Sequence, residues 1–490
     1  MEQQLSSTIP AIAAAVRAST PHDPVAAAEQ IAILLYLKLL DAEDGPPASS
    51  REGRSPAIFA SQAERYRWRH WHHLPATDLV AFLTKEVLPY MGSLEKEEPA
   101  IAGFFRDAEL SSKDQEATRR AVLEIDAIPL AQLDPATAGD LLEGLLAAVG
   151  WREVDGMYGT SPVLRNLLVR LADPRPGETV LDPAMGAAGL LADAARHAQE
   201  EGGAAPRLLG LEVSRTMLRI ATVNMALRGL PTEGLRRQDA LSDREGNLGG
   251  LTPGGVDVVL CDPPFGPRRL DEGVGVSGSM RSRRLEALFL DVAMRALTEG
   301  GRAAIVVPDG VLFDPGPAHV ELRRALVEEF DLLCVLSMTP GRFRAQTLLR
   351  SSVLVFGRPS PSYGPRPKRI WFHQLAGGTR RRGRPDGLED RTGLSDFLRN
   401  WERHRERGFM DPPGLPAEAI LDSGSRQPRS WWAERDVIAD SGYRLDAQRW
   451  APVVSDWPLD DDPAELAATA SRDYRKLAEE IEALATAIGS

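Results

Sequence analysis

The alternation of short β-rich runs with helical stretches between residues 151 and 358 constrains the fold more than any other feature of the chain. Most of the runs are separated by helical patterns of ten or more residues. Such alternation predicts βαβ units and a parallel sheet covered by helices on both faces. We therefore predict a doubly wound α/β core, which binds its ligand beyond the carboxyl ends of the strands. The runs are ETVLDPA (178–184), RLLGLEV (207–213), LRRQDAL (235–241), VDVVLCDPP (256–264), GRAAIVVP (301–308), DLLCVLSM (331–338) and SSVLVFG (351–357).

The last two runs, 331–338 and 351–357, have no long helical pattern between them. A parallel connection usually passes through a helix, whereas antiparallel strands need none. We therefore predict that these two strands form an antiparallel pair at the edge of the sheet.

The segments on either side of the α/β region lack its alternation of β-rich and helical patterns. Residues 1–150 carry helical patterns with short breaks, which predicts an all-α N-terminal domain before the core at 151–358. Residues 359–460 are rich in Pro, Gly and Trp, so we predict a mixed C-terminal extension. Residues 461–490 start like a capped helix and continue with a 3,4 spacing of apolar residues. Such a seam favours a partner helix, either in this protein's own helical domain or in another subunit.

Composition excludes several classes of protein. The longest apolar runs fall short of the ~18 residues that a membrane span needs, and the first twenty residues lack the pattern of a secretion signal. The two cysteines, Cys261 and Cys334, lie in apolar runs and are interpreted as reduced core thiols. We therefore expect a cytoplasmic protein. The net charge of −12 argues against non-specific coating of nucleic acid but allows a local basic cleft.

The first β-rich run leads into a loop of small residues, DPAMGAAG. Small residues at a strand-to-helix turn let a ligand approach the backbone closely. The loop lacks the full G-x-G-x-x-G spacing of a dinucleotide site, and no Walker lysine follows, which disfavours NAD and ATP. The candidate binding residues in this loop are Asp182, Pro183, Gly186, Ala187, Ala188 and Gly189.

Two further acids follow β-rich runs. Glu212 ends the second run, where a carboxylate can accept both ribose hydroxyls of a nucleoside or remain a solvated strand-end group. Asp239 ends the third run, where it can accept from an adenine amino group or cap the next turn. Both are candidate cofactor-binding residues.

The sharpest signal is the segment DPPFG after the apolar run VDVVLC. Two prolines extend neither a central strand nor a helix interior, so they predict a rigid exposed loop at the carboxyl edge of the sheet. Its Asp and a backbone carbonyl can accept hydrogen bonds from an exocyclic amino group, while the Phe stacks on a planar base. The candidate catalytic residues are Asp262, Pro263, Pro264 and Phe265.

These segments resemble a known family. DPPF is similar to the [DN]-P-P-[YFW] loops of methyltransferases that modify planar amino groups, and DPAMGAAGLL resembles their S-adenosylmethionine loop. More narrowly, the chain resembles the modification (M) subunit of type I restriction–modification systems, an N6-adenine DNA methyltransferase. The resemblance includes MYGTSP (157–162) and residues 279–313, and more loosely SGYRLDAQRW (441–450). It implies a Rossmann-like class I methyltransferase core, S-adenosylmethionine as cofactor, and cofactor contacts from Tyr158, Thr160, Ser161 and Pro162.

The sequence departs from the family pattern at several positions. The family loop is usually N-P-P-F, whereas this chain has Asp262, a residue that serves in other adenine methyltransferases. Ala187 and Ala188 stand where Ser/Thr and Gly are common, and Gly159 and Ser161 interrupt the Tyr-Thr-Pro-like segment. Two alternatives stay open: an amino-group methyltransferase with another acceptor (cytosine N4, RNA or protein glutamine), and a catalytically silent scaffold that binds DNA or partners.

The implied reaction places adenine N6 against Asp262 and the Pro263 carbonyl, after the base has left the duplex to stack on Phe265. Implied partners are double-stranded DNA, a specificity subunit, a second copy of the chain and a separate restriction or motor subunit. We expect no metal site, although the segment 68–73 holds three of the eight histidines. A basic segment after the DPPF loop supplies the candidate DNA contacts Arg268, Arg269, Arg281, Arg283 and Arg284.

Overall fold

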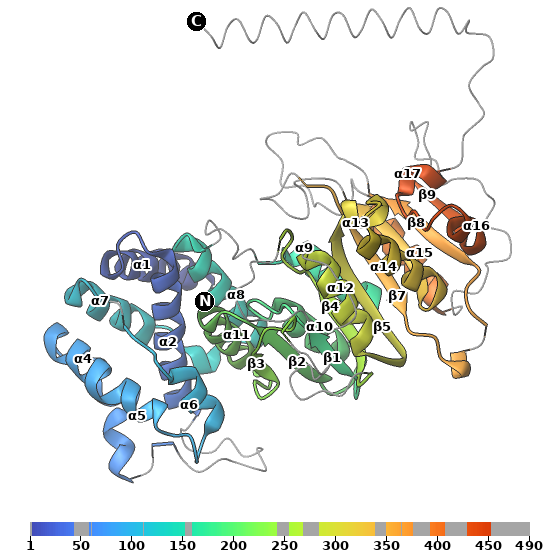
Figure 1. Ribbon diagram of the computed structural model, residues 1–490. Coiled ribbons are helices and arrows are strands. Elements are labelled where there is room, and N and C mark those ends of the chain that lie inside the picture. Colours follow the sequence, from blue (N-terminus) through green and yellow to red (C-terminus); the bar gives the residue numbers. More distant parts are fainter. Residues whose placement is uncertain are drawn as a thin grey trace, which may run out of the picture.

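A computed structural model describes residues 2–43, 58–59, 61–110, 112–151, 159–242, 254–267, 284–338, 349–363, 365–375, 393–406 and 429–451. Within these ranges the strands form one nine-stranded sheet in the order β3-β2-β1-β4-β5-β7-β6-β8-β9. Figure 1 shows this sheet beside a group of helices from the N-terminal part of the chain. The strands are β1 (Thr179–Asp182), β2 (Arg207–Glu212), β3 (Leu235–Arg237), β4 (Val256–Cys261), β5 (Leu297–Pro308), β6 (Asp331–Met338), β7 (Ser351–Gly357), β8 (Arg369–Gln374) and β9 (Ser430–Glu434).

The first five strands pair in parallel, as the β-rich runs predict. β1 lies between β2 and β4, β2 pairs with β3, and β4 pairs with β5. The central strands are mostly apolar, as expected where helices cover both faces of a sheet; Val258, Val259 and Leu260 of β4, for example, are fully buried. The doubly wound α/β class is confirmed.

The predicted antiparallel pair is present, but its predicted place at the edge is wrong. β7 pairs antiparallel with both β5 and β6, so it lies inside the sheet. Its residues 353–356 are almost completely buried, which is typical of an interior strand. β8 and β9, from the segment 359–460, continue the sheet beyond β6.

β3 is shorter than the run 235–241 predicts. It ends at Arg237, and Asp239 follows two residues later. The Asp239 carboxylate accepts the backbone N–H of Leu241 at 2.8 Å, and its carbonyl accepts that of Ser242 at 3.1 Å. These two bonds close a turn, which ends the extended backbone.

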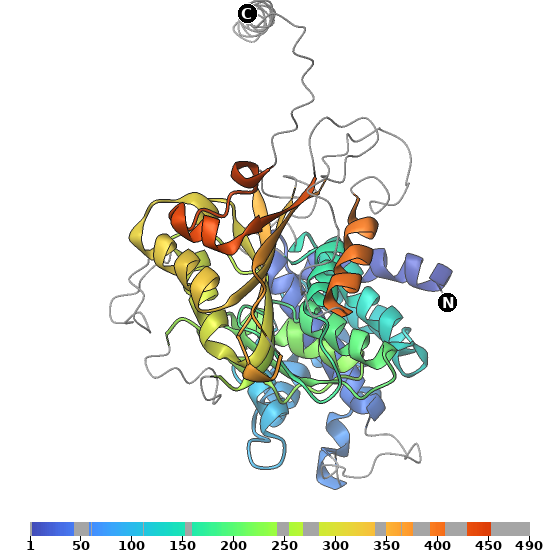
Figure 2. The same cartoon turned by 90° about the vertical axis from the view of Figure 1, so that its right-hand side faces the viewer.

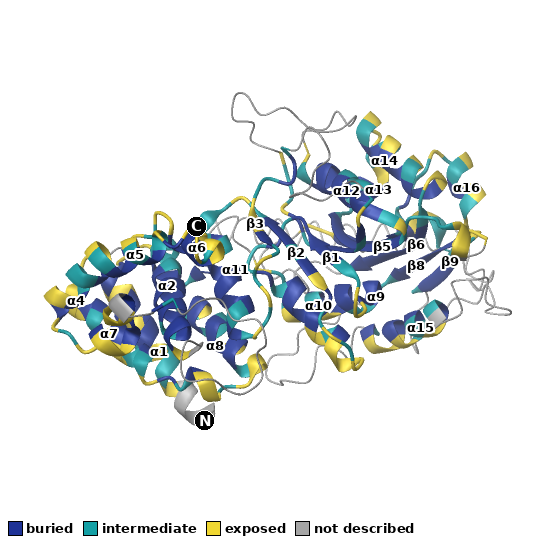
Figure 3. Cartoon of the chain, turned by 90° about the horizontal axis from the view of Figure 1, so that it is seen from below, coloured by how far each residue is buried: buried dark blue, intermediate teal, exposed yellow. Residues whose placement is uncertain are grey.

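Helices cover the two faces of the sheet. α9, α10 and α15 pack on one face, and α12, α14 and α16 pack on the other. Figure 2 shows α15 and α16 on opposite sides of the strands, and Figure 3 shows buried residues concentrated along the strands and the inner helix faces. The helices are α9 (Pro162–Ala172), α10 (Gly189–Glu200), α11 (Arg215–Leu227), α12 (Leu285–Ala296), α13 (Gly310–Phe313), α14 (Pro317–Glu328), η5 (Pro361–Tyr363), α15 (Leu394–Glu406), α16 (Arg435–Asp440) and α17 (Ala447–Trp450).

Every element that the structure describes before α9 is helical. These helices surround a hydrophobic core of their own, in which the apolar helix α2 is central. They are α1 (Glu2–Ser19), α2 (Pro24–Glu43), η1 (Ser61–Tyr66), α3 (Trp68–Trp71), α4 (Ala76–Phe82), η2 (Leu83–Val87), α5 (Leu88–Gly92), α6 (Pro99–Phe105), α7 (Gln115–Asp126), η3 (Leu130–Gln132) and α8 (Pro135–Ala148). We call α1 to α8 the helical region.

Helix α11 belongs to both cores. Ile220 and Val223 pack in the core of the helical region, whereas Ala221 and Met225 pack under the sheet. Arg219, whose side chain is 3% exposed, pairs with Glu29 of α2 and donates to backbone carbonyls at the end of α6. The helical region is therefore fastened to the α/β core through one of the core's own helices.

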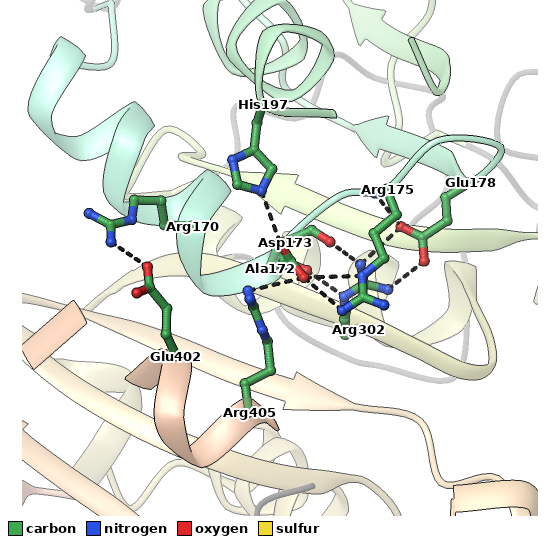
Figure 4. Close-up of polar contacts among 9 residues, drawn as sticks. All are labelled: Arg170, Ala172, Asp173, Arg175, Glu178, His197, Arg302, Glu402 and Arg405. Atoms are coloured by element: carbon green, nitrogen blue, oxygen red, sulfur yellow. Dashed lines mark hydrogen bonds and ion pairs between the residues drawn. The ribbon is translucent and has the colours of Figure 1, made fainter. Parts of the chain in front are cut away.

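An ion-pair cluster around Asp173 fastens α15 to the core (Figure 4). The Asp173 carboxylate contacts Arg405 of α15 at 3.0 Å, Arg175 at 3.1 Å and the His197 ring nitrogen Nε2 at 2.9 Å. Arg170 of α9 pairs with Glu402 of α15 in the same cluster. Although burial raises the pKa of Asp173, these partners outweigh it and lower that pKa from 3.8 to about 2.

We expect Asp173→Asn to lower the free energy of unfolding at pH 7 by roughly 1–2 kcal/mol, a value reduced for solvent screening. Because the pKa of Asp173 is lower in the folded protein, its ionised carboxylate contributes its full stabilisation above pH 3.8. This contribution is lost as the pH falls through 2. Urea denaturation of both proteins should therefore show a difference at pH 7 that shrinks at pH 3. Glu402→Gln, which breaks a more exposed pair, is the control and should cost less; equal losses in the two variants would contradict the prediction.

Several predicted residues lie outside the described ranges. They include the predicted C-terminal helix (461–490), Tyr158, Arg268, Arg269, Arg281 and Arg283. Among the residues that the structure does describe, no helix is both long and apolar enough to span a membrane.

Candidate active site

The loop after β1 has the backbone geometry of a close-approach turn. Gly186 adopts φ +54° and Ala188 adopts φ +60° immediately before α10. The N–H of Met185 donates to the Leu211 carbonyl at 3.1 Å, which ties the loop to β2. A left-handed conformation costs a residue other than glycine about 1–2 kcal/mol. Ala188 carries this cost, which a glycine at the same position would avoid.

Three carboxylates meet at the carboxyl ends of the neighbouring strands β2, β1 and β4. Asp182 ends β1 opposite Gly210 of β2, and Glu212 lies two residues further along β2. Asp262 follows the last residue of β4, the strand on the other side of β1. Because neighbouring strands lie about 4.8 Å apart, the fold brings these three acids into one cluster.

The cluster raises the pKa of its most buried member. Asp182 is 1% exposed, and burial raises its pKa from 3.8 to about 8, with smaller increases from the charges of Asp262 and Glu212. A backbone hydrogen bond from Ala184 at 3.1 Å opposes the shift. Burial also raises the pKa of Glu212. A ligand with a positive charge would relieve this accumulation of negative charge.

Glu212 is held by the backbone on both sides. Its Oε2 accepts the N–H of Gly186 at 3.1 Å, and its Oε1 accepts that of Ser214 at 2.8 Å. An ionised carboxylate has about four acceptor positions, so capacity remains for ligand hydroxyls. The next residue, Val213, is 58% exposed, so its apolar side chain is accessible beside the Glu212 carboxylate. Val213 is absent from the residues predicted from sequence, although it directly follows the predicted residue Glu212.

The other predicted cofactor residues lie near this loop. Pro183 is buried, Ala187 is partly buried, and the Ala187 carbonyl accepts from Asn224 of α11 at 2.8 Å. Pro162 is the first residue of α9, and Thr160 and Ser161 precede it; Ser161 Oγ caps the helix by accepting the N–H of Leu164 at 3.3 Å. Asp239 caps its turn, the second of the two roles that the sequence left open, with its carboxylate partly buried.

The DPPF loop begins with Asp262, directly after the last residue of β4, Cys261. Pro263 is buried, Pro264 is exposed, and the partly exposed ring of Phe265 packs against the core under the sheet. Gly266 then turns with φ +111°, and its N–H donates to Glu286 Oε2 at 2.9 Å. Glu286 is 1% exposed in the first turn of α12. It anchors the end of the loop, a role invisible in sequence because the two residues are twenty positions apart.

Arg284, a predicted DNA contact, is engaged within the protein. Its Nε donates to Oε1 of Glu286 at 2.9 Å, while its side chain is 55% exposed. Pro267 and Arg284 form an isolated antiparallel bridge. Pro267 and Arg284 therefore lie side by side, next to the anchor at Glu286.

The strand order, the central antiparallel strand and the acid-lined loop define a class I S-adenosylmethionine-dependent methyltransferase. A family model for N-6 DNA methylases matches residues 134–453, more than half of the chain. The chain belongs to the N-6 DNA methylase family. It is therefore a DNA methyltransferase that modifies adenine N6 and uses S-adenosylmethionine as the methyl donor.

Individual relatives agree with this family. The methylase subunit of the type I restriction enzyme EcoEI from Escherichia coli is 25% identical over 366 residues, 70% of this chain and 72% of the relative. The StySPI methylase subunit from Salmonella potsdam is 27% identical over 437 residues, 80% and 76% of the two chains.

Solved structures agree as well. A chain solved in a study of complex assembly in a type I restriction–modification system superposes with a TM-score of 0.70 at 25% identity, covering 98% of this chain and 97% of that one. The methyltransferase subunit of a type I system from Streptococcus thermophilus shares the fold, with a TM-score of 0.66 at 18% identity, over 92% and 99% of the chains. The predicted fold class and family are confirmed.

Proposed function

We propose that the Asp262–Phe265 loop is the catalytic centre for methylation of adenine N6. The observation that supports this most directly is the position of the loop at the end of β4. Asp182 ends the neighbouring strand β1, and Glu212 ends β2 on the far side of β1. The adenine amino nitrogen is a poor nucleophile because its lone pair is delocalised into the ring. Asp262 and the Pro263 carbonyl accept its two hydrogens, which favours a pyramidal nitrogen with a localised lone pair. Phe265 stacks on the base once it has left the duplex.

The residues around the β1 loop fit the cofactor. The turn at Gly186 and Ala188 allows close approach, Glu212 is oriented to accept ribose hydroxyls, and exposed Val213 offers an apolar contact to the adenine ring. When bound, S-adenosylmethionine supplies an electrophilic methyl group on a sulfonium sulfur. The protein's contribution is to align the amino nitrogen with that methyl group and to exclude water. We assign no step to a metal.

The chain also acts as the modification subunit of a larger assembly in the cytoplasm. Its similarity to type I methylase subunits, over most of both chains, supports this proposal. The assembly joins double-stranded DNA, a specificity subunit, a second copy of this chain and a separate restriction or motor subunit. The specificity subunit binds to the helical region and to the predicted helix at 461–490. The basic segment that ends at Arg284 contacts DNA phosphates.

The test is methyl transfer from labelled S-adenosylmethionine to unmethylated double-stranded DNA. We expect transfer when the products of the neighbouring genes are present and little with the protein alone. Deletion of residues 462–490 should abolish assembly but leave cofactor binding unchanged. Full activity of the protein alone would contradict the proposal that a separate subunit supplies sequence specificity. Methylation of RNA or of cytosine would contradict the proposal that adenine N6 of DNA is the methyl acceptor.

A further inference from the structure

Two largely buried arginines from the α/β core converge on one carboxylate of the helical region. Glu143 of α8 accepts from the guanidinium of Arg165 at 2.9 Å, and that of Arg228 lies 3.7 Å away. The side chains of Arg165 and Arg228 are only 12% and 11% exposed. Because burial reduces solvent screening, removing one partner from such a contact costs more than removing one from a surface pair.

Each arginine reaches a different side of the loop after β1. Arg165 also donates to Asp193 of α10 at 2.8 Å and to the Thr160 carbonyl at 3.2 Å, so it joins the helix after the loop to the segment before α9. Arg228 donates to Asn224 Oδ1 at 3.0 Å. Asn224, 3% exposed, in turn donates to the Ala187 carbonyl at 2.8 Å, within the loop itself.

Two glycines make room for this arrangement. A Cβ on Gly139 of α8 would lie 2.0 Å from Cζ of Arg228, and one on Gly189 would lie 2.8 Å from Cδ of Arg165. The sequence predicts Gly189 as a cofactor-binding residue. The structure gives it a second reason to be glycine, because it lets Arg165 cross the start of α10.

We propose that Glu143 is a positioning residue through which the helical region sets the conformation of the cofactor loop. Glu143 holds Arg165 and Arg228, and these hold the flanks and the Ala187 carbonyl of the loop. A displacement of α8 relative to the core therefore changes the affinity for the cofactor. The inference deepens the proposed function, since it rests on the assignment of the loop after β1 to S-adenosylmethionine.

Calorimetric titration of the full-length protein with S-adenosylmethionine tests this directly. Glu143→Ala should weaken cofactor binding about tenfold, within the range of measured coupling between sites. Glu143→Gln keeps an acceptor for Arg165 and should recover part of the loss. The matched control is Asp140→Asn on the same helix, whose 78% exposed carboxylate lies 3.9 Å from Arg228 and should leave the dissociation constant unchanged.

Asn224→Ala tests the same series of contacts, from Glu143 through Arg228 and Asn224 to the Ala187 carbonyl, at its other end. It keeps the inference testable if the Glu143 variants fail to fold. Combined with Glu143→Ala, it should weaken binding less than the product of the two single effects, because both break one route. Lower melting temperatures with unchanged cofactor affinity in folded variants would overturn the inference and leave the proposed function intact. A wild-type protein that fails to bind S-adenosylmethionine would overturn both.

Discussion

Replacing Asp262 by alanine should reduce methyl transfer by about a hundred- to a thousandfold, as expected for loss of one preorganised hydrogen bond to the reacting group. The variant leaves the Pro263 carbonyl to orient the amino group alone, so the nitrogen keeps its planar, delocalised form. The cofactor loop is untouched. Methyl transfer under single-turnover conditions, with saturating cofactor and partner proteins present, measures the loss in the chemical step.

Asp262→Asn is the matched variant. Its side-chain carbonyl still accepts a hydrogen bond from the amino group, and asparagine is the usual residue in the family loop. We expect it to keep most of the activity, and both variants still to bind S-adenosylmethionine. Full activity of Asp262→Ala would place catalysis elsewhere.

The ends of β1, β2 and β4 could be located from sequence because local signals agree there. An apolar run ending in Asp182, Glu212 or Asp262 marks a strand that reaches the carboxyl edge, and parallel pairing then brings the acids together. The place of β7 could not be read in this way. Its pattern is that of any buried strand, and only the pairing with β5 and β6 decides that it lies between them.

β8 and β9 were missed for a related reason. They depend on tertiary packing of aromatic residues, such as Trp371 of β8 stacked on Trp432 of β9 at 5.5 Å between ring centroids. The composition of a stretch rich in Pro, Gly and Trp does not predict which aromatic residues will pair across strands. The prediction for residues 359–460 therefore stopped at a mixed extension.

The positioning residues could not be predicted from sequence, because their roles also depend on tertiary contacts. Glu286, Asn224 and Arg165 act through contacts with backbone and side chains that are distant along the chain. Motif reading finds residues whose type and spacing are dictated by the ligand. It does not find those whose type is dictated by a neighbouring helix.

The acid cluster predicts that cofactor affinity depends on pH. In the cofactor-free protein the pKa of Asp182 is raised to about 8, so its carboxyl is mostly protonated at pH 6. A bound sulfonium cation favours the ionised form, and binding below pH 8 therefore releases a proton. By linkage, affinity for S-adenosylmethionine rises with pH, by at most about tenfold per unit, and levels off above the pKa of Asp182.

S-adenosylhomocysteine provides the comparison, because it has the same nucleoside and amino acid parts but no sulfonium charge. The ratio of the two affinities, measured by calorimetry from pH 6 to 9, should favour S-adenosylmethionine increasingly up to about pH 8. Asp262→Asn removes one of the charges that raise the pKa of Asp182, so the same rise should be complete at a lower pH. A ratio independent of pH would mean that the sulfonium does not interact with Asp182. The carboxyl would then be a buried structural group beneath the loop rather than part of what distinguishes substrate from product.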